Sequence, residues 1–339
     1  MQIKGVRIAA IAAAVPKNIQ KLSQIEAFTE GQAEKFSRVT GITERRIATE
    51  NMYVSDLIAA ACKRLFHDNN LEPKDVGLFV AITQSGDNAA PGVALKVSCM
   101  MGLPQNHLAF DINLGCSSFP YGLSIVASML RSLNIAKGVL CIGDISSRLC
   151  YPADLSTYPL FGDAGSAILI EKTSDPCDVL SFDLNSDGSG RTDIFVEAGG
   201  LASMSPPLNL FANAKTPAHM QLKGANVFSF AIDKAPKSIK ALMSRFSLEE
   251  PDICVLHQAN KKINKFIEAE LGFQKCAFPE TLTSFGNTSS VTIPLTLVAN
   301  YGGTILNQNM VACGFGVGLS WGAVHTSLNN CKISDLVEV

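Results

Sequence analysis

The sequence contains no long run of basic residues, no Cys-x-x-Cys pair and no Cys/His cluster with zinc-finger spacing. With a net charge of −2 and a pI of about 6.2, nucleic acid is not an expected partner. No apolar run is long enough to span a bilayer. The ten cysteines are scattered, many beside apolar neighbours. We therefore expect reduced, mostly buried thiols in a cytoplasmic protein without a zinc site.

What the sequence does contain is apolar residues, which make up 47% of its 339 positions. A chain of this size forms about two domains or one large α/β unit. Near the N-terminus, Lys4 and Arg7 precede the apolar run Ile8–Val15, an arrangement found in short signal peptides and in buried strands. Because the run is rich in alanine, lacks leucine and ends at Pro16, we expect a first strand here.

Short apolar runs alternate with segments of helical periodicity along the chain. In Ser55–Asn69, for example, Leu57, Ala61 and Leu65 fall on one side. Strands that are apolar throughout predict buried sheets covered by helices, in an α/β fold. Strands are expected at Val6–Ile11, Val76–Thr83, Leu108–Ile112, Gly138–Gly143, Gly165–Ile170, Val179–Leu184, Ile253–Gln258, Met310–Phe315 and Gly318–His325. Further helices are expected at Pro91–Met101, Pro120–Ser132, Val227–Ser244, Lys261–Leu271 and Ile293–Tyr301.

The order of these elements occurs twice, as a match of pattern and not of identity. We therefore expect two similar halves, residues 1–172 and 173–339, joined by the polar connection at 171–178. Such a duplicated fold places loops from the two halves opposite one another. The four matching pairs are Val6–Ile11 with Val179–Leu184, Leu78–Thr83 with Ile253–Gln258, Gly138–Gly143 with Met310–Phe315, and Gly165–Ile170 with Gly318–His325.

A thiol, an imidazole and a carboxamide lie in small-residue loops or at strand ends: Cys116, His257 and Asn287. Cys116 stands between the strand expected at Leu108–Ile112 and the helix expected at Pro120–Ser132. Free N–H groups and the positive end of the helix dipole favour a thiolate there, which predicts a nucleophile. The alternative interpretation is a cysteine that is merely buried.

His257 ends an expected strand, and Asn287 lies between Gly286 and Thr288 before an expected helix. Their structural alternatives are a buried histidine and a turn residue or helix cap. As catalysts, a neutral imidazole N–H and an amide NH2 can both donate to one thioester oxygen and stabilise an enolate. Together with Cys116, the set predicts carbon–carbon bond formation on acyl thioesters.

The turn Gly314–Gly318 is rich in glycine, a pattern that alone indicates little more than a tight turn. Its functional interpretation is an oxyanion hole. The backbone N–H of Val317 would join that of Cys116 in binding the oxygen of the Cys116 thioester.

These motifs resemble the β-ketoacyl-acyl-carrier-protein synthase III group of the thiolase-like condensing enzymes. The resemblance implies a five-layered αβαβα fold of two duplicated halves, a homodimer, and no metal or redox cofactor. It runs nearly end to end and covers Thr40–Ala48, the Cys116 loop, Phe161–Gly165, Asn185–Ser189, Gly224–Phe228, His257–Asn260, Gly286–Ser289 and Ser320–Gly322.

The resemblance also implies a two-stage reaction. Cys116 accepts an acyl group from a thioester donor, and malonyl on an acyl carrier protein then binds. His257 and Asn287 stabilise the enolate left by loss of CO2, and that carbanion attacks the acyl group on Cys116. Two alternatives stay open: acyl transfer from Cys116 to an oxygen, nitrogen or sulfur nucleophile without decarboxylation, and an inactive partner subunit of a heterodimer.

Several positions depart from the family pattern. Members that use coenzyme A hold its adenine between a Trp and an Arg, and another Arg contacts the nucleotide. The aligned positions here are Lys35, Val39 and Leu155. We therefore expect a donor other than acyl-CoA held in the usual way, for example a carrier-bound acyl group. The expected setting is a specialised lipid or polyketide-type pathway.

Two further positions bear on the acyl pocket. Ala90 stands where short-chain members often carry a Phe contributed across the dimer, so we expect room for a longer or bulkier acyl group. Phe228 is expected to line the same pocket.

Lys261, Lys262 and Lys265 form a basic cluster on the helix expected after His257. A solvated helix face is one interpretation. The other is a docking surface for an acidic acyl carrier protein.

Overall fold

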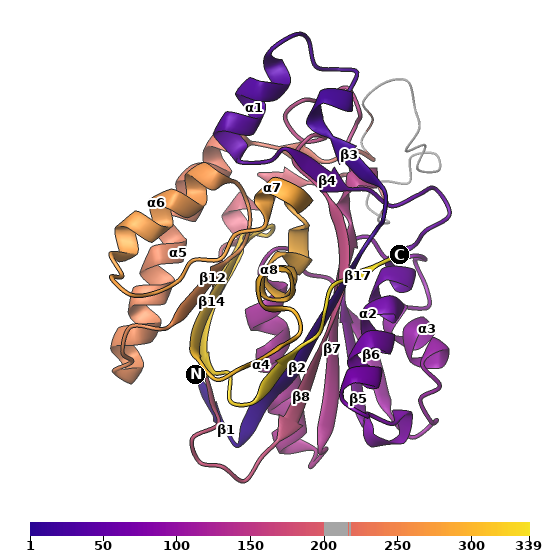
Figure 1. The fold of residues 1–339 in the computed structure, drawn as a ribbon, viewed down its shortest axis with the longest axis vertical. Coiled ribbons are helices and arrows are strands. Elements are labelled where there is room, and N and C mark those ends of the chain that lie inside the picture. The colour runs from indigo at the N-terminus through magenta and orange to yellow at the C-terminus, as the bar shows by residue number, and fades with distance from the viewer. Residues whose placement is uncertain (200–215, 217) are drawn as a thin grey trace.

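The computed structural model describes residues 1–199, 216 and 218–339. Two mixed β-sheets form the centre of the molecule (Figure 1). The first sheet has eight strands, in the order β13-β16-β2-β8-β7-β5-β6, with β17 also paired to β2. These strands are β2 (Val6–Val15), β5 (Leu78–Ile82), β6 (Leu108–Ile112), β7 (Lys137–Ile145), β8 (Asp163–Lys172), β13 (Thr304–Leu306), β16 (Cys331–Ile333) and β17 (Val337–Glu338).

The second sheet has five strands, in the order β1-β9-β15-β14-β12. Its first strand comes from the N-terminus of the chain, whereas β13, β16 and β17 from the C-terminal part join the first sheet. The two sheets are therefore tied together by exchanged edge strands. The strands of the second sheet are β1 (Gln2–Lys4), β9 (Val179–Ser186), β12 (Ile253–Leu256), β14 (Asn309–Gly316) and β15 (Ser320–Ser327).

The repetition predicted from the sequence is confirmed at the level of the strands. The order β2-β8-β7-β5 in the first sheet is matched by β9-β15-β14-β12 in the second. In both sets the first two pairings are antiparallel and the third is parallel. The boundary between residues 172 and 173 stays a prediction.

Helices form three layers around and between the sheets, as Figure 1 shows. The middle layer packs against strands of both sheets and consists of α4 (Ser118–Ser132) and α8 (Thr292–Tyr301). The outer face of the first sheet is covered by α2 (Val54–Asp68) and α3 (Val93–Met100). The outer face of the second is covered by α5 (Gly224–Phe246) and α6 (Lys261–Leu271). The result is the predicted five-layered αβαβα fold.

The middle helix α4 shows why the layers hold together. Its apolar side chains Phe119, Leu123, Val126 and Leu130 recur at helical spacing and are all 0% exposed. Burying each such side chain contributes about 1.5–3 kcal/mol relative to leaving it in water. Because strands of both sheets contact this helix, its N-terminus is held in a fixed position between them.

The predicted elements are present, with shifts of one to three residues at most boundaries. The apolar run near the N-terminus is the buried strand β2, as expected. The strand expected from Gly318 begins at Ser320 instead, because Gly318 has a φ of +131° and belongs to the preceding turn. Elements that were not predicted are the short strands β1, β13, β16 and β17 and six others: α1 (Gln32–Thr40), α7 (Leu282–Phe285), β3 (Ile19–Lys21), β4 (Glu44–Arg46), β10 (Ile194–Phe195) and β11 (Gln221–Leu222).

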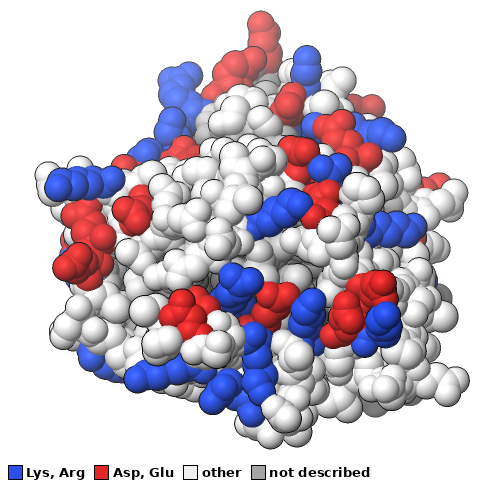
Figure 2. Space-filling model, turned by 60° about the horizontal axis from the view of Figure 1, so that its bottom comes forward, with Lys and Arg blue, Asp and Glu red and all other residues white. Residues whose placement is uncertain are grey.

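Charged side chains of both signs lie on the face of the molecule shown in Figure 2. They form groups separated by wide uncharged areas. This mixture agrees with a net charge of −2. Within the described ranges, no helix is long and apolar enough to cross a bilayer.

Candidate active site

Cys116 lies in the turn that links β6 to α4, directly before the first turn of that helix. The residue is buried, at 7% exposure. The end of β14 packs against it, since a Cβ atom added at Gly316 would lie 2.8 Å from the Cys116 sulfur. Glycine is therefore required at position 316, because any side chain there would displace the thiol.

The surroundings of the Cys116 thiol favour its protonated form. Burial raises its pKa to about 12, and the negative charge of Asp144 acts in the same direction. Hydrogen bonds from the backbone N–H groups of Val317 and Cys116 and from the side chain of Ser289 lower the pKa but do not compensate. The predicted preference for a thiolate is therefore wrong for the free protein, because desolvation outweighs the helix terminus.

His257 directly follows β12, and its backbone N–H donates to the carbonyl of Cys313 on β14 at 2.8 Å. The residue is 2% exposed. Its Nδ1 lies 2.7 Å from the Thr292 hydroxyl, and its ring meets Phe315 edge-on with 5.3 Å between centroids. Burial lowers the pKa of His257 to about 3. The imidazole is therefore neutral at pH 7 and carries a single N–H.

Asn287 is held by backbone hydrogen bonds on both sides. Its N–H donates to the carbonyl of Leu160 at 2.9 Å, and its carbonyl accepts from the N–H of Gly162 at 3.1 Å. In the side chain, Oδ1 accepts a hydrogen bond from the N–H of Ser289 at 2.9 Å. This bond orients the carboxamide, so that its NH2 group is the end left for a ligand.

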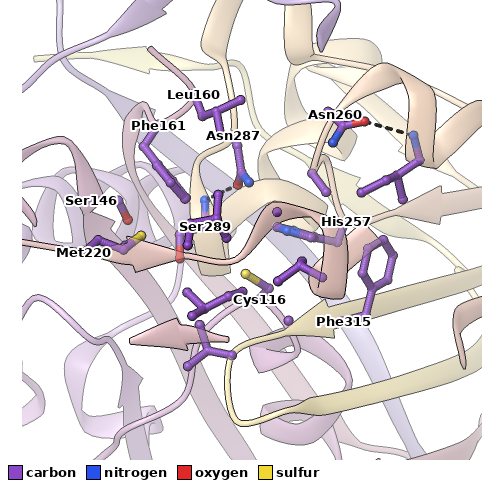
Figure 3. A pocket seen from close by; sticks show the side chains of 18 of the residues that line it. Cys116, Ser146, Leu160, Phe161, Met220, His257, Asn260, Asn287, Ser289 and Phe315 are labelled. Carbon is purple, nitrogen blue, oxygen red and sulfur yellow. Dashed lines mark hydrogen bonds between the residues drawn. The ribbon is translucent and has the colours of Figure 1, made fainter. Parts of the chain in front are cut away.

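The thiol, the imidazole and the carboxamide line one cavity of about 90 Å³. Figure 3 shows Cys116 below, with His257 and Asn287 above it. The backbone turn at Val317 also lines this cavity. Much of the remaining wall is apolar and includes Leu149, Phe161, Ile194, Met220, Val227 and Ile263.

A buried carboxylate connects the two sides of the cavity. Asp144, at 1% exposure, accepts through Oδ1 from the Thr83 hydroxyl, the Gln84 N–H and the Ser85 hydroxyl at 2.9–3.2 Å. Its Oδ2 accepts from the N–H and the hydroxyl of Ser290, at 3.3 and 2.5 Å. Asp144 thus ties the loop after β5 to the segment that follows Asn287.

The two residues predicted for the acyl pocket are not among those that line this cavity. Ala90 is exposed in the loop before α3. At the start of α5, Val227 lines the cavity, whereas the ring of Phe228 faces the Lys262 ammonium at 5.2 Å. Neighbouring helical positions differ by about 100° in direction, so only one of the two can point inward.

The basic cluster on α6 divides into two kinds of lysine. Lys265 lies 2.7 Å from Glu268 and 3.3 Å from Glu280, so its charge is balanced locally. Lys261 and Lys262 make no ion pair with any described residue. Only these two remain available to an acidic partner.

Two of the three positions where nucleotide contacts were expected to be missing lie on α1, near the top of Figure 1. Lys35 is exposed on that helix, and Val39 is 55% exposed. Leu155 packs into a small apolar cluster with Phe28 and Phe36. None of the three presents an aromatic ring or a guanidinium.

Sequence reasoning missed several polar residues around the cavity. Ser289 and Thr292 lie close to Asn287 in the chain, and this closeness could have indicated both as candidate site residues. Asp144 and Ser146 follow each other closely at the end of β7, and Gln84 follows β5. The position of these three at the ends of neighbouring parallel strands was the only hint available.

Among the described residues, no three His, Cys, Asp or Glu side chains gather as they would around a metal ion. The ten cysteines all lie in the described part of the chain and are free thiols, seven of them buried.

A five-layered αβαβα fold with a buried cysteine, a histidine and an asparagine around one cavity defines a thiolase-like condensing enzyme. Comparison with known proteins narrows this class. The model of 3-oxoacyl-[acyl-carrier-protein] synthase III matches residues 110–188, and that of its C-terminal part matches residues 243–328. The chain belongs to the β-ketoacyl-acyl-carrier-protein synthase III family and is an acyltransferase of that type.

Individual relatives cover nearly the whole chain. The β-ketoacyl-[acyl-carrier-protein] synthase III of Listeria welshimeri is 32% identical over 315 residues, covering 91% of this chain and 95% of the relative. That of Streptococcus thermophilus strain LMD-9 is 30% identical over 322 residues, covering 94% and 98%. The crystal structure of a 3-oxoacyl-(acyl-carrier protein) synthase from Burkholderia xenovorans LB400 superimposes with a TM-score of 0.93 at 25% identity, covering 100% and 98%.

Proposed function

We propose that this enzyme loads an acyl group on Cys116 and condenses it, with loss of CO2, with a malonyl thioester carried by an acyl carrier protein. The observation that carries the proposal is the convergence of three groups on one cavity: the Cys116 thiol, the neutral His257 imidazole and the oriented Asn287 amide. The product is a 3-oxoacyl thioester.

In the first stage the sulfur of Cys116 attacks the carbonyl carbon of the donor thioester. A new carbon–sulfur bond forms, the donor's own carbon–sulfur bond breaks, and the proton of Cys116 leaves with the departing thiol. The N–H groups of Val317 and Cys116, which already approach the sulfur, face the oxygen that becomes negative during this step.

In the second stage the malonyl thioester loses CO2, and its carbonyl oxygen takes up the charge of the resulting enolate. The N–H of His257 and the NH2 of Asn287 donate to that oxygen. The enolate carbon then bonds to the acyl carbon on Cys116, the bond to sulfur breaks, and the released thiolate takes up a proton from water. A histidine with a pKa of about 3 serves here as a neutral donor, not as an acid.

The test is CO2 release from malonyl-carrier protein, compared between the wild type and Asn287→Ala. A loss of CO2 release in the variant, with Cys116 acylation retained, supports condensation. Acyl transfer to an oxygen, nitrogen or sulfur nucleophile, the second candidate, requires no enolate and would leave the wild type without CO2 release. Intact-protein mass spectrometry after exposure to donors tests the remaining alternative, since an inactive subunit would not be acylated.

The acyl donor in this proposal is bound to a carrier protein, and the pathway is a specialised lipid or polyketide-type one. The absence of an aromatic ring and guanidinium groups at Lys35, Val39 and Leu155 supports this choice. Acylation of Cys116 by acyl-carrier protein is expected to exceed acylation by the same acyl group on coenzyme A. Equally efficient acylation by free acyl-CoA would contradict it.

Docking of the carrier protein is proposed at Lys261 and Lys262, whose charges are not balanced by described acidic residues. Charge reversal at Lys262 should weaken turnover with carrier-bound substrate more at low salt than at high salt. Charge reversal at Lys265, which pairs with Glu268 and Glu280, is the matched control and should have the smaller salt-dependent effect. Equal effects at both positions would place the carrier elsewhere.

A second copy of the chain is the proposed partner of the β6 edge. This strand ends the first sheet, yet its apolar Leu108 is 44% exposed. On the adjoining α3, Leu95 is 52% and Met100 43% exposed. We expect light scattering to give twice the chain mass, and Leu108→Lys to reduce the measured mass.

In such a dimer Ala90 would lie near the partner's cavity, and Ala90→Phe should shorten the preferred acyl chain. An unchanged chain-length preference would contradict that role.

A further inference from the structure

Four polar side chains line the cavity beyond the Cys116, His257 and Asn287 set. Asn260 accepts from the N–H of Ile263 and so caps α6, and Ser289 hydrogen-bonds the Cys116 thiol. The other two are not used by the proposed mechanism. They are Ser146, which follows β7, and Gln84, which follows β5. The cavity wall near Ser146 is otherwise apolar and includes Leu149, Ile194 and Met220. In the view of Figure 3, Ser146 and Met220 lie on the opposite side of Cys116 from His257.

Ser146 is almost fully enclosed, at 3% exposure. Its hydroxyl has no hydrogen-bond partner among the residues that the structure describes. Burying a hydroxyl without a partner is unfavourable, so such groups in proteins usually meet water or a ligand. The hydroxyl of Ser146 is therefore free to donate or accept within the cavity.

Gln84 is held in place at both ends. Its backbone N–H donates to Asp144 at 2.9 Å, and its Nε2 donates to Oδ1 of Asn113 at 3.3 Å. The other end of the carboxamide faces the loop that carries the nucleophile, because a Cβ at Gly115 would lie 2.5 Å from Oε1 of Gln84. No described residue donates to this Oε1, which leaves it as an acceptor beside Gly115, the residue before Cys116.

We propose that the acyl group loaded on Cys116 bears a hydroxyl substituent, which donates to Oε1 of Gln84 and pairs with the hydroxyl of Ser146. A hydroxyl group satisfies both side chains, since it is a donor and an acceptor at once. A keto group has no proton for Gln84, and an unsubstituted alkyl chain offers a hydrogen-bond partner to neither side chain. This inference rests on the proposed loading of Cys116 and specifies the class of its substrate.

The test compares three donors that differ only at carbon 3: the butyryl, 3-hydroxybutyryl and 3-oxobutyryl thioesters of N-acetylcysteamine. A fourth donor, 4-hydroxybutyryl, covers the next hydroxyl position. This small carrier removes any dependence on coenzyme A or carrier-protein contacts. The rate of Cys116 acylation is followed by intact-protein mass spectrometry. We expect at least one hydroxyacyl donor to exceed the butyryl and 3-oxobutyryl donors by about tenfold or more, because a site that hydrogen-bonds a substrate hydroxyl rejects analogues that lack it.

Variants then assign the preference to the two side chains. Ser146→Ala and Gln84→Leu should each reduce the ratio of hydroxyacyl to butyryl acylation toward one. Met220→Leu, an apolar substitution in the same wall, is the control and should change both rates in parallel. Circular dichroism checks folding, and Ser146→Ala alone suffices if Gln84→Leu does not fold.

The outcomes separate this inference from the proposed function. If Cys116 is acylated at equal rates by all four donors, or if neither variant changes the ratio, the hydroxyacyl inference is wrong while the loading of Cys116 stands. If neither these four donors nor carrier-bound donors acylate Cys116, the proposed function fails, and the inference fails with it.

Discussion

The hydroxyl oxygen of Thr292 lies 2.7 Å from Nδ1 of His257, at the start of the buried helix α8. Neutral imidazole has one N–H, and the hydrogen bond at Nδ1 decides which nitrogen carries it. The Thr292 hydroxyl has one proton and two acceptors within reach, Nδ1 of His257 at 2.7 Å and the carbonyl of Ser289 at 3.3 Å. When it donates to the nearer Nδ1, the imidazole proton resides on Nε2, where it can reach a thioester oxygen in the cavity. Thr292 is thus placed to set the tautomer that the proposed second stage requires.

Replacing Thr292 by valine keeps the shape of the side chain and removes the hydroxyl. We expect decarboxylation of the malonyl thioester to fall by about 10- to 100-fold, because the imidazole loses the partner that holds the proton on Nε2. Cys116 acylation should change much less. Thr292→Ser is the control and should restore CO2 release. Equal losses in acylation and decarboxylation would indicate a general structural defect instead.

Asn287→Asp distinguishes the role of the Asn287 amide oxygen from that of its NH2 group. Aspartate can still accept the hydrogen bond from the Ser289 N–H, measured at 2.9 Å in the wild type. It replaces the NH2 donor by a negatively charged oxygen, which repels the enolate. We expect CO2 release to fall by about 10²- to 10³-fold, with acylation of Cys116 retained by intact-mass measurement. Unchanged CO2 release would show that the amide does not act on the enolate.

Asp144→Asn should affect stability and thiol reactivity in opposite directions. The variant loses hydrogen bonds to a buried carboxylate, which we expect to lower the free energy of unfolding by about 1–3 kcal/mol. It also removes a negative charge that helps to raise the pKa of Cys116, so alkylation of Cys116 by iodoacetamide should become faster at pH 8. Peptide mass spectrometry after timed alkylation measures this rate.

The matched control for Asp144→Asn is Asp163→Asn. Asp163 is also fully buried, and it accepts hydrogen bonds from the N–H groups of Ala48 and Ser147 at 2.8 and 3.0 Å. Its charge is not among the main causes of the shifted pKa of Cys116. The Asp163→Asn substitution should therefore destabilise the protein without accelerating the alkylation of Cys116. Faster alkylation in both variants would mean that loosening of the fold, and not the charge of Asp144, exposes the thiol.

The positions of Cys116 and His257 in the fold could be predicted from the sequence, because each residue lies beside a strong local signal. Cys116 lies between an apolar strand and an amphipathic helix, and His257 follows an apolar strand; all three elements are present. The repeated strand order was likewise readable, since apolar runs closed by turn residues are local features. These signals depend on neighbours in the chain, which a sequence shows directly.

What the sequence did not show depends on contacts between distant segments. The link from Asp144 to Ser290 joins residues 146 positions apart, and no local pattern announces it. The choice between Val227 and Phe228 as a cavity residue depends on the rotation of α5 against the second sheet. Cys116 illustrates the same limit in energetic terms: a helix N-terminus is visible in the sequence, whereas the depth of burial that raises its pKa is not.

The buried, neutral state of His257 also predicts how stability depends on pH. Its pKa is about 3 in the folded protein, against 6.5 in the unfolded chain. Between these values the unfolded chain binds one proton more than the folded one. The free energy of unfolding therefore decreases as pH falls below 6.5, by about 1.4 kcal/mol per pH unit from this residue.

His257→Gln removes this group, so the variant should lose less stability than the wild type as the pH is lowered. Between pH 7 and pH 5 we expect the wild type to lose about 2 kcal/mol more than the variant, measured by urea denaturation at both pH values. The control is His67→Gln: the side chain of His67 is 84% exposed and pairs with Asp68 at 3.1 Å on the surface, so its loss should change the pH dependence much less than the loss of His257. Parallel pH dependence in the wild type and His257→Gln would show that the imidazole is able to take up a proton in the folded state. It would then be available as a general acid, and the assignment of His257 as a purely neutral donor would have to be abandoned.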